Sequence, residues 1–234
     1  MVSTPIGNLG DITFRAVETL KKVKIVAAED TRYSKKLFNH YDIHTPMLSY
    51  FEHNNVLRIP RILRTLKEGD SIALITDAGT PAISDPAYRL VREAILEKIK
   101  VESIPGPSAV LASIVSSGLP TDRFIFEGFL PPKKGRKKRI EAMKDEMATI
   151  IIYESPRRLQ RTLRQLFELL GNRPAVVARE LTKIHEEYKR GTLEELFHYY
   201  STKAPKGECV ISVSYTHLRA HETVLDLVCR LLLE

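Results

Sequence analysis

Acidic, hydroxyl and small residues follow directly on an apolar segment in the stretch SIALITDAGTPAISDP, residues 71–86. Residues 71–76 carry no charge and fit a buried parallel strand. In open α/β sheets, ligands bind just beyond the carboxyl ends of the strands. Gly79 would let a ligand approach the backbone, and Asp77 and Asp85 could accept hydrogen bonds from a hydroxyl or ammonium group. The same residues also fit a plain strand-to-helix turn, with Asp85 as N-cap and Pro86 at the first helical position, so both interpretations stay open here.

Similar polar segments follow other expected strands, at residues 5–11, 29–32, 105–108, 153–155 and 178–183. This clustering predicts a binding cleft at one end of an α/β sheet. Glu180 would face this cleft, with Lys183 reaching toward a substrate, and Asp30 would belong to a polar wall at residues 29–32. Each of them also fits a structural role, Asp30 in a capped helix start and the other two in an exposed salt-bridge cluster.

Several common catalytic motifs are missing from the sequence. There is no GxGxxG or GxxxxGK[ST], which argues against a dinucleotide fingerprint and a P-loop, and no GxSxG or HExxH, which argues against a serine hydrolase and a zinc protease. His217, His221 and Cys229 have a weak metal-ligand spacing, but they lie in a C-terminal stretch that we set aside below. The sequence predicts no metal site.

Composition places the chain among ordinary globular proteins, with 43% hydrophobic and 28% charged residues in 234. No apolar run reaches the length of a membrane span, no secretory signal is visible, and two cysteines give no disulfide framework, so we expect a cytoplasmic protein. The formal charge of +7 favours a polyanionic partner. The positive charge is concentrated in two segments, KKGRKKR at 133–139 and PRRLQRTLR at 156–164.

Apolar strands alternate with amphipathic helices along the first half, which predicts βαβ units and a mainly parallel sheet. We expect strands at 23–28, 71–76 and 101–104, and in the second half at 149–153, 175–179 and 208–211, with helices at 134–147, 156–170 and 193–200 between them. The composition changes at about 118–123, because phenylalanines, two prolines and the basic segment follow there. This change predicts two α/β domains, residues 1–120 with a truncated first strand and residues 121–211. Residues 212–234 contain VSYTHLRAHET, which resembles sequencing-adapter read-through, and we expect them to be a non-native tail.

Nine segments in register resemble one family. TPIGNLGD, AAEDTR, YFEHN, ITDAGTPAISDP, IPGPSA, GLPTDRFIFEGFLP, YESPRRL, ARELTK-HEE and KGE are similar to the ribosomal RNA small subunit methyltransferase I family of the tetrapyrrole methylase superfamily, over about residues 3–211. The resemblance implies a two-domain tetrapyrrole-methylase (class III methyltransferase) fold, each domain an open mixed or parallel sheet flanked by helices. It also implies a cytoplasmic, homodimeric enzyme whose cofactor lies in the cleft between the domains, and which needs no membrane or metal.

The implied reaction is S-adenosylmethionine-dependent methylation of the ribose 2′-hydroxyl of a cytidine (cytidine 1402 in the family) in the decoding region of 16S rRNA, in the small ribosomal subunit. Carried over by position, Asp30, Glu180 and Lys183 are the catalytic candidates. The implied cofactor-binding residues are Asp77, Ala78, Gly79, Thr80, Ile83, Pro107, Ser108, Ala109, Tyr153, Ala178 and Leu181. The implied RNA-binding residues are Arg32, Lys133, Lys134, Arg136, Lys137, Lys138 and Arg139.

The sequence departs from the family pattern at Ala87, where glycine usually follows SDP; if this position needs a positive φ, the loop would shift and cofactor affinity would fall. Two alternatives remain open. The first is a methyltransferase of the same superfamily acting on a tetrapyrrole or a diphthamide precursor, against which the basic segments count. The second is a catalytically silent RNA-binding module, which would bind no S-adenosylmethionine.

Overall fold

The structure, a computed structural model, describes residues 1–51, 55–85 and 87–215, and it divides into two compact units, Met1–Ala109 and Val110–Glu234. The division falls directly after Ala109, the first residue of helix α5 (Ala109–Val115), about ten residues before the boundary that the sequence suggested. Hydrogen bonds explain why α5 belongs with the second unit. The Tyr188 hydroxyl donates to the Ala112 carbonyl, and the Arg190 guanidinium donates to the Ser117 carbonyl.

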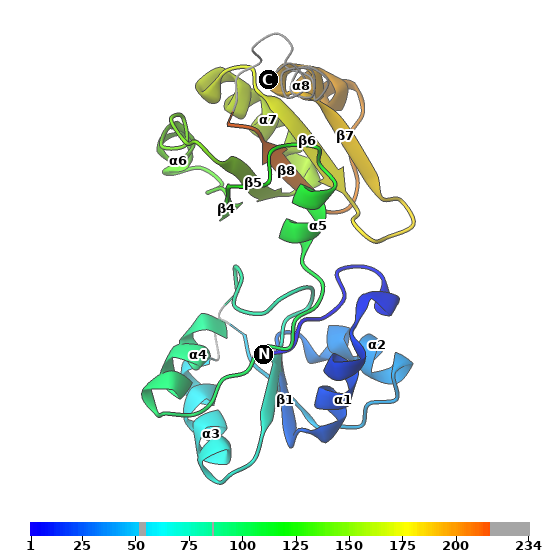
Figure 1. Ribbon diagram of the computed structural model, residues 1–234, viewed down its shortest axis with the longest axis vertical. Coiled ribbons are helices and arrows are strands. Elements are labelled where there is room, and N and C mark those ends of the chain that lie inside the picture. The colour runs from blue at the N-terminus through cyan, green and yellow to red at the C-terminus, as the bar shows by residue number, and fades with distance from the viewer. Residues whose placement is uncertain (52–54, 86, 216–234) are drawn as a thin grey trace, which may run out of the picture. The chain divides into compact units, whose positions relative to one another are not determined.

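The first unit is a three-layer α/β structure around a parallel sheet with strand order β2-β1-β3 (Figure 1). Its elements in chain order are the 3₁₀ turn η1 (Leu9–Asp11), α1 (Phe14–Lys22), β1 (Ile25–Ala28), α2 (Thr31–His40), β2 (Met47–Ser49), α3 (Asn55–Lys67), β3 (Ile72–Ile75) and α4 (Ala87–Leu96). Strand side chains alternate between two apolar clusters. Val26 and Ile75 pack with α1 and α2, whereas Ala27 and Leu74 pack with α3 and α4. The short, uncharged strands β1 and β3 are largely buried, as the sequence predicted, whereas β2 is half-buried.

The N-terminal residues extend this sheet without forming a full strand. The Val2 amide donates to the Leu74 carbonyl at 2.9 Å, and the Ile104 amide donates to the Met1 carbonyl at 2.8 Å. Val2 is buried between β3 and the segment before Pro105. The strand that we expected at 101–104 is reduced to a single bridge at Ile104.

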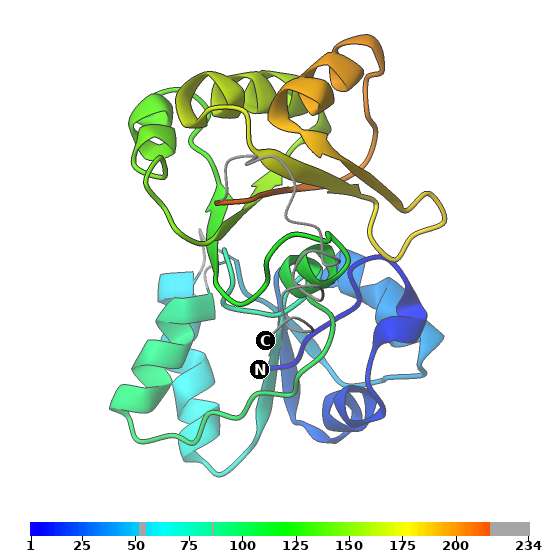
Figure 2. The same cartoon turned by 45° about the horizontal axis from the view of Figure 1, so that its top comes forward.

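The second unit has a mixed sheet with strand order β4-β5-β8-β6-β7, in which only the β4–β5 pair is parallel. Its elements after α5 are β4 (Phe124–Phe129), α6 (Arg136–Glu141), β5 (Thr149–Glu154), α7 (Pro156–Leu170), β6 (Pro174–Arg179), β7 (Glu187–Thr192), α8 (Leu193–Thr202) and β8 (Cys209–Val213). Helices α6, α7 and α8 cover one face of this sheet (Figure 2). The predicted fold class, two α/β units with one parallel and one mixed sheet, is confirmed.

One predicted boundary was wrong, because the helix expected over 134–147 ends at Glu141. The first residues of the expected non-native tail, Ser212 and Val213, belong to β8, where Val213 is buried and pairs with Ile150 and Ala175. Residues 216–234, with His217, His221 and Cys229, lie outside the described residues. In the described part of the chain, no helix has the length and apolar character needed to cross a membrane.

Asp85 holds the start of α4, as predicted for an N-cap. Its Oδ1 accepts from the Ala87 amide at 2.8 Å and its Oδ2 from the Ala82 amide at 2.7 Å, while Pro86 lies outside the described residues. Ala87 is the first residue of α4 and is buried. The left-handed conformation occurs at Ala82 and Ser84, with φ of 70° and 66°.

We therefore predict that Ala87→Gly lowers the free energy of unfolding by about 1 kcal/mol, because glycine loses more backbone entropy in a helix and leaves the buried methyl site empty. Urea denaturation of the two proteins measures the difference. An increase in stability would show that residue 87 needs a positive φ and would contradict the helical assignment.

Candidate functional site

The carboxyl ends of β1 and β3 are joined by hydrogen bonds between their first loop residues. The Thr76 hydroxyl donates to Glu29 Oε2 at 2.6 Å, and the Asp30 amide donates to Asp77 Oδ1 at 2.9 Å. Because the two strands are parallel neighbours, their loops begin at the same edge of the sheet. Three carboxylates, those of Glu29, Asp30 and Asp77, therefore gather at this edge, which is where α/β proteins bind ligands.

The carboxylates at this edge have different acidities. Burial raises the pKa of Asp77; the Asp30 amide opposes this shift, and the charges of Glu29 and Asp30 add to it. The side chain and backbone amide of Arg32 lower the pKa of Asp30 to about 2. Asp30 is also the N-cap of α2, so the capped-helix interpretation is confirmed for it. A carboxylate with so low a pKa is a weak proton acceptor, whereas Asp77 gains stability from a bound cation.

The loop after β3 is fixed to two other loops. Gly79, at φ 87°, exchanges two backbone hydrogen bonds with Thr4, of 3.0 and 2.9 Å. The Thr80 hydroxyl donates to the Pro107 carbonyl at 3.2 Å and lies 3.0 Å from the Ser3 hydroxyl. A side chain at position 79 would be strained, because only glycine adopts this φ freely.

The first unit therefore brings most of its predicted cofactor-binding residues to one sheet edge. Around the fixed loops, some side chains are exposed and others half-buried: Ala78 and Ile83 are exposed, and Pro107, Ser108 and Ala109 are half-buried. This edge combines negative charge, hydroxyls and an exposed apolar side chain.

In the second unit, the turn after β6 holds Glu180 and Lys183 in an ion-paired cluster. Lys183 Nζ lies 2.8 Å from Glu180 Oε1 and 2.9 Å from Glu208 Oε2, and the Glu208 amide donates to Glu180 Oε1 at 3.0 Å. Glu180 has φ of 51°, and its carboxylate occupies the space that a Cβ on Gly207 would need. The glycine of the KGE segment is therefore required by its neighbour as well as by its own φ of 85°.

This cluster supplies charge rather than a proton acceptor. Burial raises the pKa of Glu180, but the hydrogen bonds from Lys183 and the Glu208 amide outweigh it, and the net shift is downward. Burial lowers the pKa of Lys183, but its bonds to Glu180 and Glu208 produce a net upward shift. At neutral pH Lys183 is an ammonium beside the ionised Glu180, so Lys183 could polarise an oxygen but cannot remove its proton.

The remaining predicted residues of the second unit lie across neighbouring strands. Tyr153 and Ala178 flank Val210 in the registers of β5, β8 and β6, so all three occupy one row of the sheet. The Tyr153 ring packs edge-on against Phe126 at 4.8 Å, and burial raises the pKa of its hydroxyl. Ala178 and Leu181 have buried side chains, so a ligand could reach only their backbone atoms.

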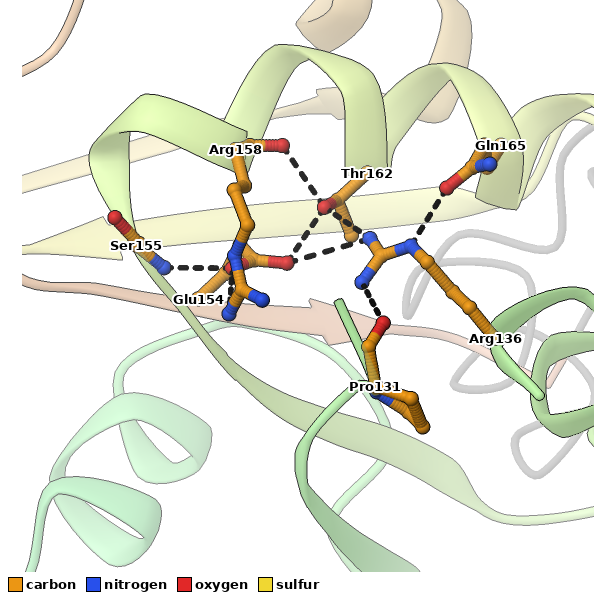
Figure 3. A network of polar contacts seen from close by, with 7 residues as sticks. All are labelled: Pro131, Arg136, Glu154, Ser155, Arg158, Thr162 and Gln165. Atoms are coloured by element: carbon orange, nitrogen blue, oxygen red, sulfur yellow. Dashed lines mark hydrogen bonds and ion pairs between the residues drawn. The ribbon is translucent and has the colours of Figure 1, made fainter. Parts of the chain in front are cut away.

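A buried ionic network at the end of β5 was not predicted (Figure 3). Glu154 Oε1 accepts from the Ser155 amide at 2.7 Å and lies 2.8 Å from an Arg158 nitrogen, while Oε2 accepts from the Thr162 hydroxyl at 2.6 Å and lies 3.4 Å from Arg136 Nη2. The sequence signal was the spacing of Glu154, Arg158 and Thr162, which are four residues apart. This spacing places the Glu154 carboxylate just before the first turn of α7, on the side of the helix where Arg158 and Thr162 lie.

This network corrects the assignment of Arg136 to the RNA-binding residues. Its side chain is 3% exposed, and its guanidinium also donates to Gln165 Oε1 at 2.7 Å and to the Pro131 carbonyl at 3.2 Å. A guanidinium with these partners cannot contact phosphates, so Arg136 is structural. The other predicted RNA-binding residues have exposed or partly exposed side chains: Arg32, Lys133, Lys134, Lys137, Lys138 and Arg139. Within the described ranges, no three His, Cys, Asp or Glu side chains are arranged so that they could hold a metal ion together.

Comparison with known proteins identifies the class first. The sequence model of the family described as Tetrapyrrole (Corrin/Porphyrin) Methylases matches residues 1–196. The fold is similar to a cobalt precorrin-4 methyltransferase, a cobalamin biosynthetic enzyme (TM-score 0.67, 18% identity, 92% of this chain and 93% of that one), and to uroporphyrin-III-C-methyltransferase from Thermus thermophilus (TM-score 0.64, 15% identity, 92% of each chain). The protein is thus a methyltransferase with the tetrapyrrole methylase fold.

Sequence relatives define a narrower family. The chain is 53% identical over 213 residues to ribosomal RNA small subunit methyltransferase I of Halalkalibacterium halodurans, covering 90% of this chain and 74% of the relative. It is 47% identical over 214 residues to the protein of the same name from Thermotoga maritima, covering 92% of this chain and 96% of the relative. The chain belongs to the ribosomal RNA small subunit methyltransferase I family, and the family predicted from the sequence is confirmed.

The Glu154 network gives a test of stability. Arg136→Ala leaves a buried carboxylate without one of its cations, and we expect it to lower the free energy of unfolding by about 3–5 kcal/mol. Replacing both partners, in Arg136→Met with Glu154→Leu, should recover most of this loss because no unpaired charge remains. Urea denaturation of the single and double variants measures both effects. A loss below about 1 kcal/mol for Arg136→Ala would contradict the buried pairing.

Proposed function

We propose that this protein transfers a methyl group from S-adenosylmethionine to the ribose 2′-hydroxyl of a cytidine in the decoding region of 16S rRNA, the position of cytidine 1402. The observation that carries the proposal is the identity of about half the residues, over nine-tenths of the chain, with proteins named for small subunit rRNA methylation. The exposed lysines beside α6 support an RNA substrate, because a polyanion is bound mainly through its phosphates.

The residues at the sheet edge of the first unit fit S-adenosylmethionine. The cofactor carries a sulfonium, an ammonium and ribose hydroxyls, and carboxylates such as those of Asp77 and Glu29 are their usual partners. Asp77 would accept from a hydroxyl or ammonium group, the backbone around Gly79 would allow close approach, and Ile83 would offer an apolar contact. When bound, the cofactor supplies a methyl group activated for displacement.

The protein's main contribution to such a displacement is to orient the reactants. The crossed hydrogen bonds among Thr4, Gly79, Thr80 and Pro107 hold the loops before any ligand arrives. Lys183, kept as an ammonium by Glu180 and Glu208, would stabilise negative charge that develops on the attacking oxygen. Asp30 would remain ionised and act through its charge.

The setting of the reaction is part of the same proposal. The decoding region is part of the small ribosomal subunit, so we propose that the assembled subunit is the substrate. We also propose that the enzyme acts in the cytoplasm as a homodimer. A tetrapyrrole substrate is the second candidate, because the two solved structures cited above belong to cobalamin and porphyrin methylation. The basic segments favour RNA over this small substrate.

The proposal is tested by methyl transfer from labelled S-adenosylmethionine. We expect label on 30S subunits from a strain lacking the modification, located at the 2′-oxygen of one cytidine, and none on uroporphyrinogen. Calorimetry should show heat on titration with S-adenosylmethionine alone. Label on the porphyrin and not on RNA would overturn the substrate, and the absence of cofactor binding would leave a silent RNA-binding module.

A second prediction concerns the charge of Lys183. Lys183→Met should lower kcat by about 10²–10³-fold, as loss of one charged donor at a developing oxyanion does, with little change in cofactor affinity. Lys183→Arg should retain part of the rate, and Lys144→Met, at an exposed lysine of the same unit, should behave as the unaltered enzyme.

The pH profile separates the other two candidates. Because the pKa of Asp30 is about 2, Asp30 stays ionised throughout, so Asp30→Asn should lower kcat equally at pH 6 and pH 9. Glu180→Gln removes a partner of Lys183 and should therefore lower the pH at which the rate declines on the alkaline side. A Lys183→Met enzyme with unchanged kcat would exclude this cluster from catalysis.

A further inference from the structure

Helices α6 and α7 are joined through the Arg136 side chain. From the first residue of α6, the guanidinium reaches the Thr162 hydroxyl and, at 2.7 Å, Gln165 Oε1, both on α7. Ile140, one turn after Arg136, is buried in the core shared with α7. These two buried residues fix the inner face of α6, whereas Lys137 and Lys138 between them are exposed.

On α7, arginines are placed beside the face that contacts α6. Arg158, Thr162 and Gln165 lie on that contacting face, at helical spacing. Arg157 and Arg161 are exposed, are one turn apart, and follow the adjacent stripe. Burial lowers the pKa of Arg136, the charge and hydrogen bond of Glu154 oppose this shift, and the positive charges of Arg158 and Arg161 add to it.

The basic side chains around this junction differ in whether their charge is already compensated. Arg139 pairs with Glu127 at 2.6 Å, Lys137 lies 3.6 Å from Glu141, and Arg164 lies 2.8 Å from Glu168. In the described ranges, five exposed basic residues of α6, its preceding loop and α7 form no ion pair. They are Lys133, Lys134, Lys138, Arg157 and Arg161.

We propose that these five residues form one continuous phosphate-binding surface for RNA, and that Arg136 is the positioning residue that keeps its α6 part beside its α7 part. The inference rests on the proposed RNA substrate and extends it to Arg157 and Arg161. Five uncompensated cations on rigid elements match a chain of phosphates, since each phosphate contacted releases bound counterions. An acidic protein is a less suitable partner than RNA, because a protein–protein interface needs apolar anchors among its charges and none of these five residues is apolar.

The test measures binding of a decoding-region RNA fragment over a range of salt concentrations. Arg157→Ala with Arg161→Ala removes two contacts, which should reduce the slope of log K against log salt by about 1.5 and weaken binding about 10–30-fold at about 0.1 M salt. Lys133→Ala with Lys138→Ala should have the same effect from the α6 side. The matched control is Arg61→Ala with Arg64→Ala, which removes two exposed arginines from α3 in the other unit and should leave the slope unchanged.

Arg136→Met tests the positioning role, because it keeps every exposed charge while removing the junction. We expect weaker RNA binding with unchanged affinity for S-adenosylmethionine, and recovery of RNA binding in the Arg136→Met, Glu154→Leu protein where packing is restored. An unaltered slope in Arg157→Ala/Arg161→Ala, or an equal loss in the α3 control, would overturn the surface while leaving the function standing. Absence of RNA binding by the unaltered protein would overturn both.

Discussion

Burial of the Glu154 carboxylate is the constraint on which the second unit is built. A carboxylate removed from water costs several kcal/mol unless cations and hydrogen bonds replace its hydration. Here the replacements come from the next backbone amide, from Arg158 and Thr162 of α7, and from Arg136 at the start of α6. Satisfying one buried charge therefore determines how two helices meet at the end of β5. The cost of that charge also explains why a guanidinium is buried within an otherwise exposed basic segment.

The first unit shows the opposite arrangement, in which carboxylates are gathered without cations between them. Glu29 and Asp77 are held by a hydroxyl and by backbone amides, and Arg32 pairs with Asp30 alone. Burial and the neighbouring charges raise the pKa of Asp77, so its ionised form is disfavoured in the free protein. A positively charged ligand relieves that strain, and part of the electrostatic energy of the edge is then recovered on binding.

Local pattern was sufficient to predict the fold class and the strand-end loops, because buried parallel strands are short, uncharged and followed by turns. It predicted Asp85 as a helix cap, since a cap depends only on residues two or three positions away. It could not predict strands β4 and β7, whose exposed or half-buried residues lack a clear period of two. It also misplaced Arg136, because burial of one arginine among six basic residues depends on Thr162 and Gln165, far along the chain. Residue type does not predict the left-handed Ala82 and Ser84 either; the Ala82 amide donates to the Asp85 carboxylate in this conformation.

Separate placement of the two signs of charge has a functional consequence. Carboxylates that attract a sulfonium cofactor would repel phosphates, and lysines that attract phosphates would repel the cofactor. At physiological salt such effects fall off over about 8 Å, so a binding surface responds mainly to the charges it carries itself. In this chain the five unpaired lysines and arginines of the proposed RNA surface belong to the second unit, whereas the acidic ends of β1 and β3 belong to the first. Lys183 lies between Glu180 and Glu208, which keep its ammonium protonated and partly neutralise its charge, so it does not act as a general phosphate anchor. A cation of that kind suits a single oxygen at which charge develops during the reaction.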